Sequence, residues 1–478
     1  MKNIISLFLV LCLSFSSKAN TYFNGGIFSN TTWTLANSPY ILNGSVVIFP
    51  GKTLTIEPGV VVKIANSSVN NGEQIYLECR GNLIAEGTSN NRISFIPETK
   101  PSNAFEQVWY GIRIKGTQGG SAKFKNIELN HSYWGILNDV ILYDSVKFES
   151  CKFSGNNYVF SMGVPLVLTN CEFVDNGVVA TLMLQYGSAT VNNCTFKRNA
   201  ACFSTLYNGI EAYNSTFENN TNCFLLMSGK FRNCVFKQNE TVFQENGNLD
   251  IESCEFIQNK FAIKGFAGSK CRFSNFSQNE VAIIAEPGSI IQNNTIFNNG
   301  VGIVLGGNNW VPAAGFDEVK DNKICYNSLY NIENQTDINW SLAKNCFCSI
   351  DSATIDVGIY DGYDNITRGL VNFMVFDSTC VQALKMVEKV QLSDPTGLAK
   401  INSAINFKVY PNPANEYINI QSDLIGNEQF QMYNLQCKLI KSVSSENAMA
   451  SFDLTDLNAG IYLIRSSNSV GAIKIQKN

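Results

Sequence analysis

The sequence predicts an all-β protein: a solenoid of parallel strands followed by a small antiparallel β-sandwich. A motif recurs about every 20 residues in the middle of the chain, in which Asn or Ser precedes Cys-x-Phe-x-x-Asn. Each repeat contains short alternating apolar runs separated by Asn and Gly, which is typical of strands and turns. Beyond residue 404 this repeat stops and a different set of alternating runs begins. The chain therefore contains two kinds of β-domain.

The repeat predicts a parallel β-helix. A unit of about 20 residues cannot bury its own apolar face, whereas stacked units bury it in one continuous column. Each repeat position then becomes a ladder of equivalent residues, one per coil. The Cys-equivalent positions are Cys151, Cys171, Cys194, Ser215, Cys234, Cys254, Ser274, Asn294 and Asn322. The Asn positions, expected at a turn where side-chain amides hydrogen-bond from coil to coil, are Asn156, Asn176, Asn199, Asn220, Asn239, Asn259, Asn279, Asn299 and Asn327.

The cysteines fit this ladder better than a disulfide scaffold. In-register parallel stacking disfavours a disulfide, so we expect the column to contain reduced thiols that act as small buried hydrophobes. Cys202 and Cys223 form a second stacked pair on the same reasoning. Disulfides are more plausible at the end of the stack, where four cysteines gather: Cys325, Cys346, Cys348 and Cys380.

Less regular coils precede the repeat, at residues 53–60, 81–95, 109–114 and 125–129. With these segments, residues 40–378 resemble the right-handed parallel β-helix superfamily, which has the pectate-lyase-like fold. We place the whole solenoid with its end caps at residues 20–378. The expected caps are residues 21–50 and 346–378, because open sheet ends must be covered. Asp351 followed by Ser352 is a suitable start for a short helix in the second cap.

The N-terminus predicts export. Residues 1–19 have a basic start at Lys2, an apolar stretch too short to span a bilayer and small residues before a cleavage site after Ala19. No later stretch predicts a transmembrane helix. We therefore expect the mature chain to be secreted or held at the cell surface.

The C-terminal module has its own signature. Residues 379–404 read as a linker, and residues 405–478 form the predicted sandwich. Its Tyr-Pro-Asn-Pro at 410–413, Tyr-Asn-Leu at 433–435 and Leu-Asn-Ala-Gly-Ile-Tyr at 457–462 resemble the type A C-terminal sorting domain of the type IX secretion system of Bacteroidetes. The resemblance implies Sec export, then outer-membrane translocation by that machinery, with the protein released or anchored on the surface.

Composition excludes several functions. Charged residues make up 15%, against about 25% in an average domain, and the net charge is −4. No basic patch indicates nucleic-acid binding. The single histidine, His131, excludes a His-rich metal site and mechanisms that need two histidines. We expect no metal and no cofactor. About 60 asparagines are consistent with a stack of polar turns.

The fold superfamily contains polysaccharide lyases and hydrolases, so an enzymatic function must be considered. Residues 113–115, Arg-Ile-Lys, match a polygalacturonase motif, but the partner motifs of that family are missing. We therefore interpret them as a strand with solvated ends. No surface column has the carboxylate density of a catalytic groove. The alternating Lys197, Glu218 and Lys237 predict a solvated ion-pair ladder.

One insertion, residues 306–318, breaks the register. Insertions in solenoids form loops that often bind ligands. Trp310 could stack on a sugar ring, and Asp317 and Glu318 could bind its hydroxyls or a cation. The main hypothesis is a non-catalytic binding or adhesion module that recognises a polysaccharide or surface glycan. The alternative is a polysaccharide lyase or glycoside hydrolase, with its site on the 109–134 coils or under the 306–318 loop.

Overall fold

The computed structural model contains two compact units, residues 1–389 and 390–478. Each has its own apolar core, and each is described by itself. The structure describes residues 20–477 apart from 66–73, 104–105, 140–144, 183–187, 206–208, 226–227, 245–247, 266–267, 287, 307–318, 343, 381–406, 423–427, 435–438, 446–448 and 467–471. The predicted signal segment and nearly all of the predicted linker lie outside the described residues.

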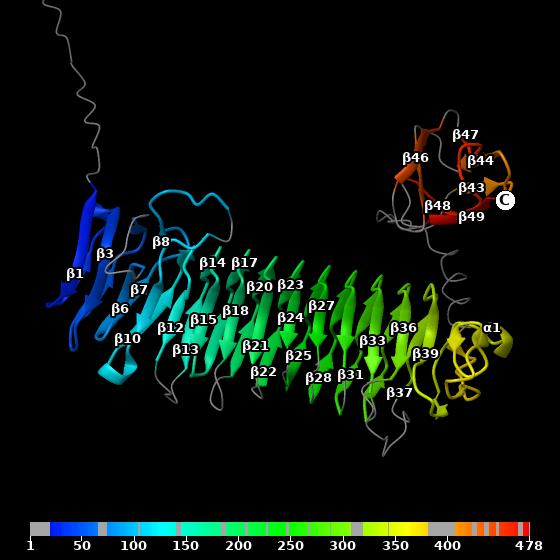
Figure 1. The fold of residues 1–478 in the computed structure, drawn as a ribbon, viewed down its shortest axis with the longest axis horizontal. Helices are drawn as coiled ribbons and strands as arrows, with labels where there is room; N and C mark the ends of the chain where they lie inside the picture. Colours follow the sequence, from blue (N-terminus) through cyan, green and yellow to red (C-terminus); the bar gives the residue numbers. More distant parts are fainter. Residues whose placement is uncertain are drawn as a thin grey trace, which may run out of the picture. The chain divides into compact units, whose positions relative to one another are not determined.

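The first unit is the predicted solenoid of parallel strands (Figure 1). Each regular coil contributes one strand to each of three sheets. The first sheet contains β2 (Thr31–Trp33), β4 (Thr53–Ile56), β7 (Asn82–Glu86), β10 (Ser121–Lys125), β13 (Val146–Glu149), β16 (Leu166–Thr169), β19 (Ala189–Asn192), β22 (Gly209–Tyr213), β25 (Ser228–Arg232), β28 (Leu249–Glu252), β31 (Lys270–Arg272), β34 (Ile290–Gln292) and β37 (Val319–Lys320).

The second and third sheets complete each coil. The second contains β5 (Val61–Ile64), β8 (Ile93–Pro97), β11 (Ile127–Asn130), β14 (Lys152–Ser154), β17 (Glu172–Val174), β20 (Thr195–Lys197), β23 (Thr216–Glu218), β26 (Val235–Lys237), β29 (Glu255–Ile257), β32 (Asn275–Ser277), β35 (Thr295–Phe297) and β38 (Lys323–Cys325). The third contains β6 (Tyr76–Cys79), β9 (Gly111–Ile114), β12 (Ile136–Asn138), β15 (Tyr158–Met162), β18 (Val178–Leu182), β21 (Ala201–Thr205), β24 (Asn222–Leu225), β27 (Thr241–Gln244), β30 (Phe261–Lys264), β33 (Val281–Ala285), β36 (Val301–Leu305), β39 (Tyr330–Asn334) and β41 (Ile359–Tyr360).

The expected N-terminal cap, residues 21–50, is not a separate element. It forms β1 (Thr21–Ile27), β2 and β3 (Tyr40–Ile48), with one turn of 3-10 helix, η1 (Leu35–Asn37). The strand β3 pairs with β1, with β5 and with β6, so it joins the second and third sheets. The segment predicted as a cap thus pairs with the sheets, and its apolar residues enter the common core.

Aromatic rings form the centre of the solenoid. The Phe of each repeat lies in the second sheet, is fully buried and stacks on its equivalent in the next coil. Ring centroids are 4.8 Å apart between Phe173 and Phe196, and 4.4 Å apart between Phe256 and Phe276. This spacing follows the distance between neighbouring strands, about 4.8 Å. The sequence repeat thus becomes a continuous apolar column.

The predicted asparagine ladder is present and is fully hydrogen-bonded. Asn199 is an example: its Oδ1 accepts from the backbone N–H and the Nδ2 of Asn176, both at 3.0 Å. Its own Nδ2 donates to the carbonyl oxygen of Phe173 at 3.1 Å and to Oδ1 of Asn220 at 3.0 Å. All four bonding positions of the amide are therefore used, which is what a buried amide requires.

Two residues in each regular coil adopt the left-handed conformation. One precedes the Cys-equivalent position and the other precedes the ladder asparagine, as with Asn193 at φ 54° and Arg198 at φ 54°. Asn tolerates this conformation better than most residues, and it holds many of these positions. His131 occupies the equivalent turn position in its coil, at φ 55°.

The cysteine prediction is also confirmed. The repeat cysteines are buried and form no disulfide, and the same is true of Cys202 and Cys223. Burial raises the pKa of the Cys271 thiol to about 12, so this thiol stays protonated at neutral pH. At the end of the stack two disulfides form, Cys325–Cys348 and Cys346–Cys380. Cys437 lies outside the described residues.

The C-terminal end of the solenoid is covered by irregular chain. A two-stranded sheet pairs β40 (Trp340–Ser341) with β42 (Val371–Asn372), and a short helix, α1 (Ser352–Asp356), lies between them in sequence. The carboxylate of Asp351 accepts from the backbone N–H of Thr354 at 3.0 Å, which is the predicted helix cap.

The second unit is the predicted small sandwich. Its three-stranded antiparallel sheet contains β43 (Phe407–Tyr410), β44 (Tyr417–Ser422) and β47 (Met449–Asp453). The four-stranded sheet contains β46 (Leu439–Ser444), β45 (Gln429–Asn434), β48 (Gly460–Ser466) and β49 (Ala472–Lys477). Alternating residues such as Ile418, Ile420 and Ile464 are fully buried between the sheets.

Candidate functional site

The residues predicted to bind a ligand, Trp310, Asp317 and Glu318, lie outside the described residues. The segment that contains them connects β36 to β37. Their role stays a prediction.

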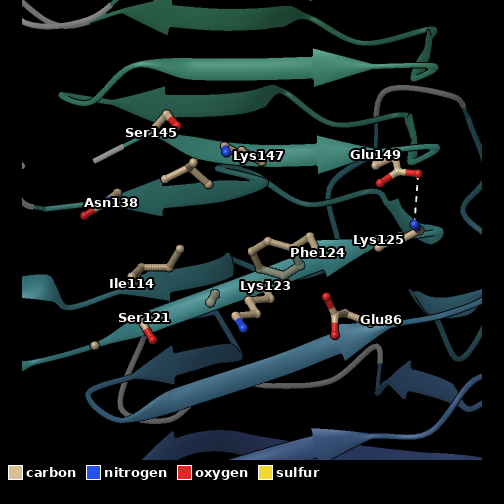
Figure 2. A pocket seen from close by; sticks show the side chains of 13 residues that line it. Glu86, Ile114, Ser121, Lys123, Phe124, Lys125, Asn138, Ser145, Lys147 and Glu149 are labelled. Carbon is tan, nitrogen blue, oxygen red and sulfur yellow. Dashed lines mark ion pairs between the residues drawn. The ribbon is translucent and has the colours of Figure 1, made fainter. Parts of the chain in front are cut away.

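A hollow of about 610 Å³ opens instead at the first sheet, where residues of β10 and β13 line it together with Glu86 of β7. Figure 2 shows Lys123 and Lys147 projecting from neighbouring strands into it. Ser121, Ser145 and Asn138 line one end, and Glu86 lies near the other. Ile114, Phe124 and Val146 add apolar surface. The lining is therefore rich in hydrogen-bond donors.

Strand alternation aims the two lysines outward. Phe124 and Phe148 are directly paired between β10 and β13, and their rings stack in the core at 5.2 Å. The residues just before them, Lys123 and Lys147, therefore point to the opposite face. They occupy equivalent positions on adjacent coils, one residue before the ladder between β10 and β13, which pairs Phe124 with Phe148 and Lys125 with Glu149. Both side chains are exposed.

The neighbours of the lysines in this column do not neutralise them. Lys123 pairs with Ile84 on one side, and Lys147 pairs with Val167 on the other. Among the described residues, neither lysine has a carboxylate within ion-pair distance. The next column is different: Lys125 Nζ lies 2.9 Å from Glu149 Oε1 (Figure 2). The hollow thus holds two uncompensated positive charges beside a neutral ion pair.

Elsewhere on the solenoid, stacked charges alternate in sign. Lys152 pairs with Glu172 at 2.8 Å in the second sheet. In the predicted ladder, Lys197 pairs with Glu218 at 3.1 Å, and Lys237 is next to Glu218 in register but forms no ion pair among the described residues. In the first sheet, Lys230 pairs with the Glu211 carboxylate at 3.0 Å. The Lys123–Lys147 column departs from this rule.

The geometry of the hollow suits anion binding better than acid–base catalysis. Glu86 and Glu149 lie two coils apart in one column, with Lys125 between them. Two strand spacings amount to about 10 Å, beyond the roughly 6.5–9.5 Å of an inverting carboxylate pair. Two ammonium groups, two hydroxyls and an amide can instead hold a carboxylate or sulfate group.

Residues 113–115 form a strand end, but the prediction of solvated ends was wrong for Arg113. Its guanidinium carbon lies 4.0 Å from the ring centroid of Tyr76 and 3.8 Å from that of Tyr110. Its Nη1 lies 3.9 Å from Oε2 of the buried Glu78. Tyr76 on the neighbouring coil and Tyr110, three residues before Arg113, attract the cation, and the contact across coils cannot be read from the linear sequence. Lys115 pairs with the Asp139 carboxylate at 3.0 Å.

Sequence analysis missed Lys123 and Lys147. The available signal was the Lys-Phe pair that occurs at 123–124 and again at 147–148. If both phenylalanines enter the core in one column, both preceding lysines must share a column on the surface. The irregular spacing of these early coils hid that register.

Comparisons with known proteins agree with this architecture. A family model described as a right-handed beta helix region matches residues 110–270. A second, described as a secretion system C-terminal sorting domain, matches residues 408–477. Among solved structures, the chain is similar to the A-module of the mannuronan C-5 epimerase AlgE6 of Azotobacter vinelandii. The identity is 13% and the TM-score 0.35, over 68% of this chain and 90% of that one. No curated protein matches.

These findings define the class of protein: a right-handed β-helix that carries a C-terminal sorting domain. The chain is a β-helix protein secreted by the type IX system, and its sorting domain implies interaction with that machinery. Secretion or cell-surface display follows from the same domain. No helix among the described residues is long and apolar enough to cross a membrane.

Proposed function

We propose that the β-helix is a non-catalytic binding or adhesion module that recognises an acidic glycan at the Lys123–Lys147 hollow. The observation that supports this most is the stacking of two unpaired ammonium groups on adjacent coils. Like charges on adjacent coils repel one another, and a bound anion between them removes that cost. The carboxylates or sulfates of a surface polysaccharide are anions that an exported protein meets.

The signal segment and the sorting domain define the proposed route. Residues 1–19 direct Sec export, and residues 405–478 then engage the outer-membrane machinery. The mature chain is released or anchored on the outer surface. Deletion of residues 405–478 should therefore leave the protein in the periplasm. Unchanged secretion of the truncated chain would refute this route.

Glycan binding is tested by affinity electrophoresis of the full mature chain. The gels contain polygalacturonate, dextran sulfate or neutral dextran. We expect retardation by the two acidic polymers alone, and loss of retardation in Lys123→Ala/Lys147→Ala. The matched control is Lys230→Ala, which removes an exposed lysine of the same sheet that is paired with Glu211. Retardation by neutral dextran, or an unaffected double variant, contradicts the proposal.

The same samples test the enzymatic alternative, a polysaccharide lyase or glycoside hydrolase. Robust release of reducing ends or unsaturated products would overturn the non-catalytic assignment. The insertion provides a further comparison, because β37 lies eight strand spacings from β13, about 38 Å along the first sheet. If Trp310→Ala or Asp317→Ala abolishes retardation while the lysine variant does not, the binding site lies at the insertion instead.

A further inference from the structure

Over nine consecutive strands, the third sheet is nearly free of charge. The nine strands β12, β15, β18, β21, β24, β27, β30, β33 and β36 contain one charged residue, Lys264. The other two sheets carry ion pairs over the same coils, such as Lys152 with Glu172 and Lys230 with Glu211. Charge depletion is therefore specific to this face, which we call the neutral face.

The neutral face presents a mixture of apolar and uncharged polar side chains. In each strand one residue enters the core, such as Phe203 or Phe224, and the next points outward. Side chains on this face that stay partly accessible are Leu137, Tyr158, Val178, Thr181, Ser204, Asn222, Leu225, Gln244, Phe261, Val281 and Ile284. A charged ligand would find almost no counter-charge here, whereas an uncharged protein surface would find matching groups.

Aromatic side chains gather at the N-terminal end of this face. The rings of Trp134 and Tyr158 stack at 4.7 Å, and Tyr133 packs edge-on against both, at 5.3 and 6.2 Å. Tyr133 is 38% exposed. Tyr and Trp are enriched, and charged residues depleted, at the cores of protein–protein interfaces. The composition of the neutral face is thus that of an interface and not of an average surface.

The size of the neutral face is that of a small dimer interface. All five residues of β36 are buried, so the accessible part of the face ends at β33. The eight strands from β12 to β33 extend for about 34 Å at about 4.8 Å per spacing, and their average of about four to five residues at about 3.3 Å gives a width of about 15 Å. The face therefore measures about 500 Å², and two such faces bury about 1,000 Å², the lower limit expected of a specific interface.

We propose that the neutral face binds the same face of a second copy of this chain. The two-fold axis passes over β24, the middle strand of the nine. Around such an axis a residue meets its own equivalent, so Leu225 on β24 faces Leu225 of the second copy. The aromatic end of one copy then lies against the β33–β36 end of the other.

Sedimentation analysis of the full mature chain tests this proposal. We expect a dimer for the wild type, and monomers for Leu225→Arg and for Leu225→Glu, because each places like charges at the axis. An equimolar mixture of these two variants should form dimers again, since opposite charges then meet. This restoration occurs only if two copies of this face contact each other.

The control variant is Thr216→Arg, on the second sheet of the same coil, which should remain dimeric. Circular dichroism shows whether each variant is folded. A monomeric wild type at high micromolar concentration overturns the proposal. So does a Leu225→Arg variant that stays dimeric, or a mixture that stays monomeric although both variants are folded.

Discussion

Two regions of the first sheet treat charge in opposite ways. Over β22, β25, β28 and β31, each cation has a carboxylate on a neighbouring coil: Arg232 Nη2 lies 2.6 Å from Asp250 Oδ2, and Arg272 Nη2 lies 3.3 Å from Asp250 Oδ1. Over β10 and β13, Lys123 and Lys147 have no such partner among the described residues. Parallel strands stack in both regions, but β10 and β13 share two paired positions whereas β22 and β25 share five.

The presence or absence of a carboxylate partner affects how the charged side chains contribute to stability. In-register stacking brings every side chain close to its equivalents, so unlike charges stabilise the stack slightly and like charges destabilise it. The region β22–β31 follows that rule. The lysine column departs from it, and under the proposed function these side chains serve binding at some cost in stability.

Charge reversal in the hollow should have the largest effect. Lys123→Glu/Lys147→Glu replaces two cations that would each contribute a charged hydrogen bond to the glycan. We expect affinity for polygalacturonate to fall by about 100-fold, on the order of 3 kcal/mol. Binding isotherms measure this, and an affinity within a few-fold of the wild type would show that the hollow is not the site.

The asparagine ladder belongs to the same solenoid but does not line the hollow. Substitutions in the ladder therefore test whether the fold can be destabilised without loss of glycan binding. Asn220→Ala removes the acceptor of the Asn199 backbone N–H and Nδ2. Buried unpaired donors should lower the free energy of unfolding by about 2 kcal/mol, measured by urea denaturation. Asn192→Ala, at an exposed position, should change it by less than about 0.5 kcal/mol. Glycan affinity of the folded protein should be unchanged in both variants.

Substitution of Asp250 tests whether ion pairs stabilise the region β22–β31, which we call the compensated region. Burial alone would raise the pKa of its carboxyl, but the hydrogen bond from Arg232 and the charges of Arg232 and Arg272 outweigh burial and lower the pKa. The ionised carboxylate thus stabilises the fold above its unfolded pKa, and this stability disappears as the pH falls through the lowered folded value. Asp250→Asn should cost about 1 kcal/mol at pH 7.

That cost should shrink below about pH 4, where the wild-type carboxyl becomes protonated as well. Thermal unfolding at a series of pH values compares the two proteins. A cost that does not change with pH would mean that Asp250 stabilises the sheet by packing and not by charge.

The smallest effect should come from a substitution that gives the lysine column charges of alternating sign, as in the region β22–β31. Lys123→Glu places a carboxylate beside Lys147, so we expect a gain of about 0.5 kcal/mol in stability together with weaker glycan binding. The same change in the compensated region, Lys230→Glu, should destabilise, because it adds a carboxylate next to Glu211 and Asp250. Stability changes of the same sign would remove the contrast between the two regions.

The fold could be predicted where the chain repeats itself. From Cys151 onward the period of about 20 residues assigns each Phe, Cys and Asn to a ladder, and the structure agrees. The early coils lack a fixed period, so Ile84, Lys123 and Lys147 share a column although unequal intervals separate them. Register there depends on loop lengths that only the folded chain defines.

Short sequence patterns predicted some local features and missed others. Asp351 predicted the start of α1 because a helix cap depends on a few neighbouring residues. The prediction of solvated ends at residues 113–115 failed for Arg113, because its packing between Tyr76 and Tyr110 depends partly on a neighbouring coil. The edge strand β46 was not predicted, because its sequence, Leu-Ile-Lys-Ser-Val-Ser, alternates only weakly.

The central claim is that the lysine column binds an acidic glycan, and isothermal titration of the mature chain with polygalacturonate tests it most directly. We predict binding that weakens as salt is raised, and no measurable binding by Lys123→Ala/Lys147→Ala, with Lys230→Ala close to the wild type. Equal affinities of the wild type and the double variant would contradict the claim.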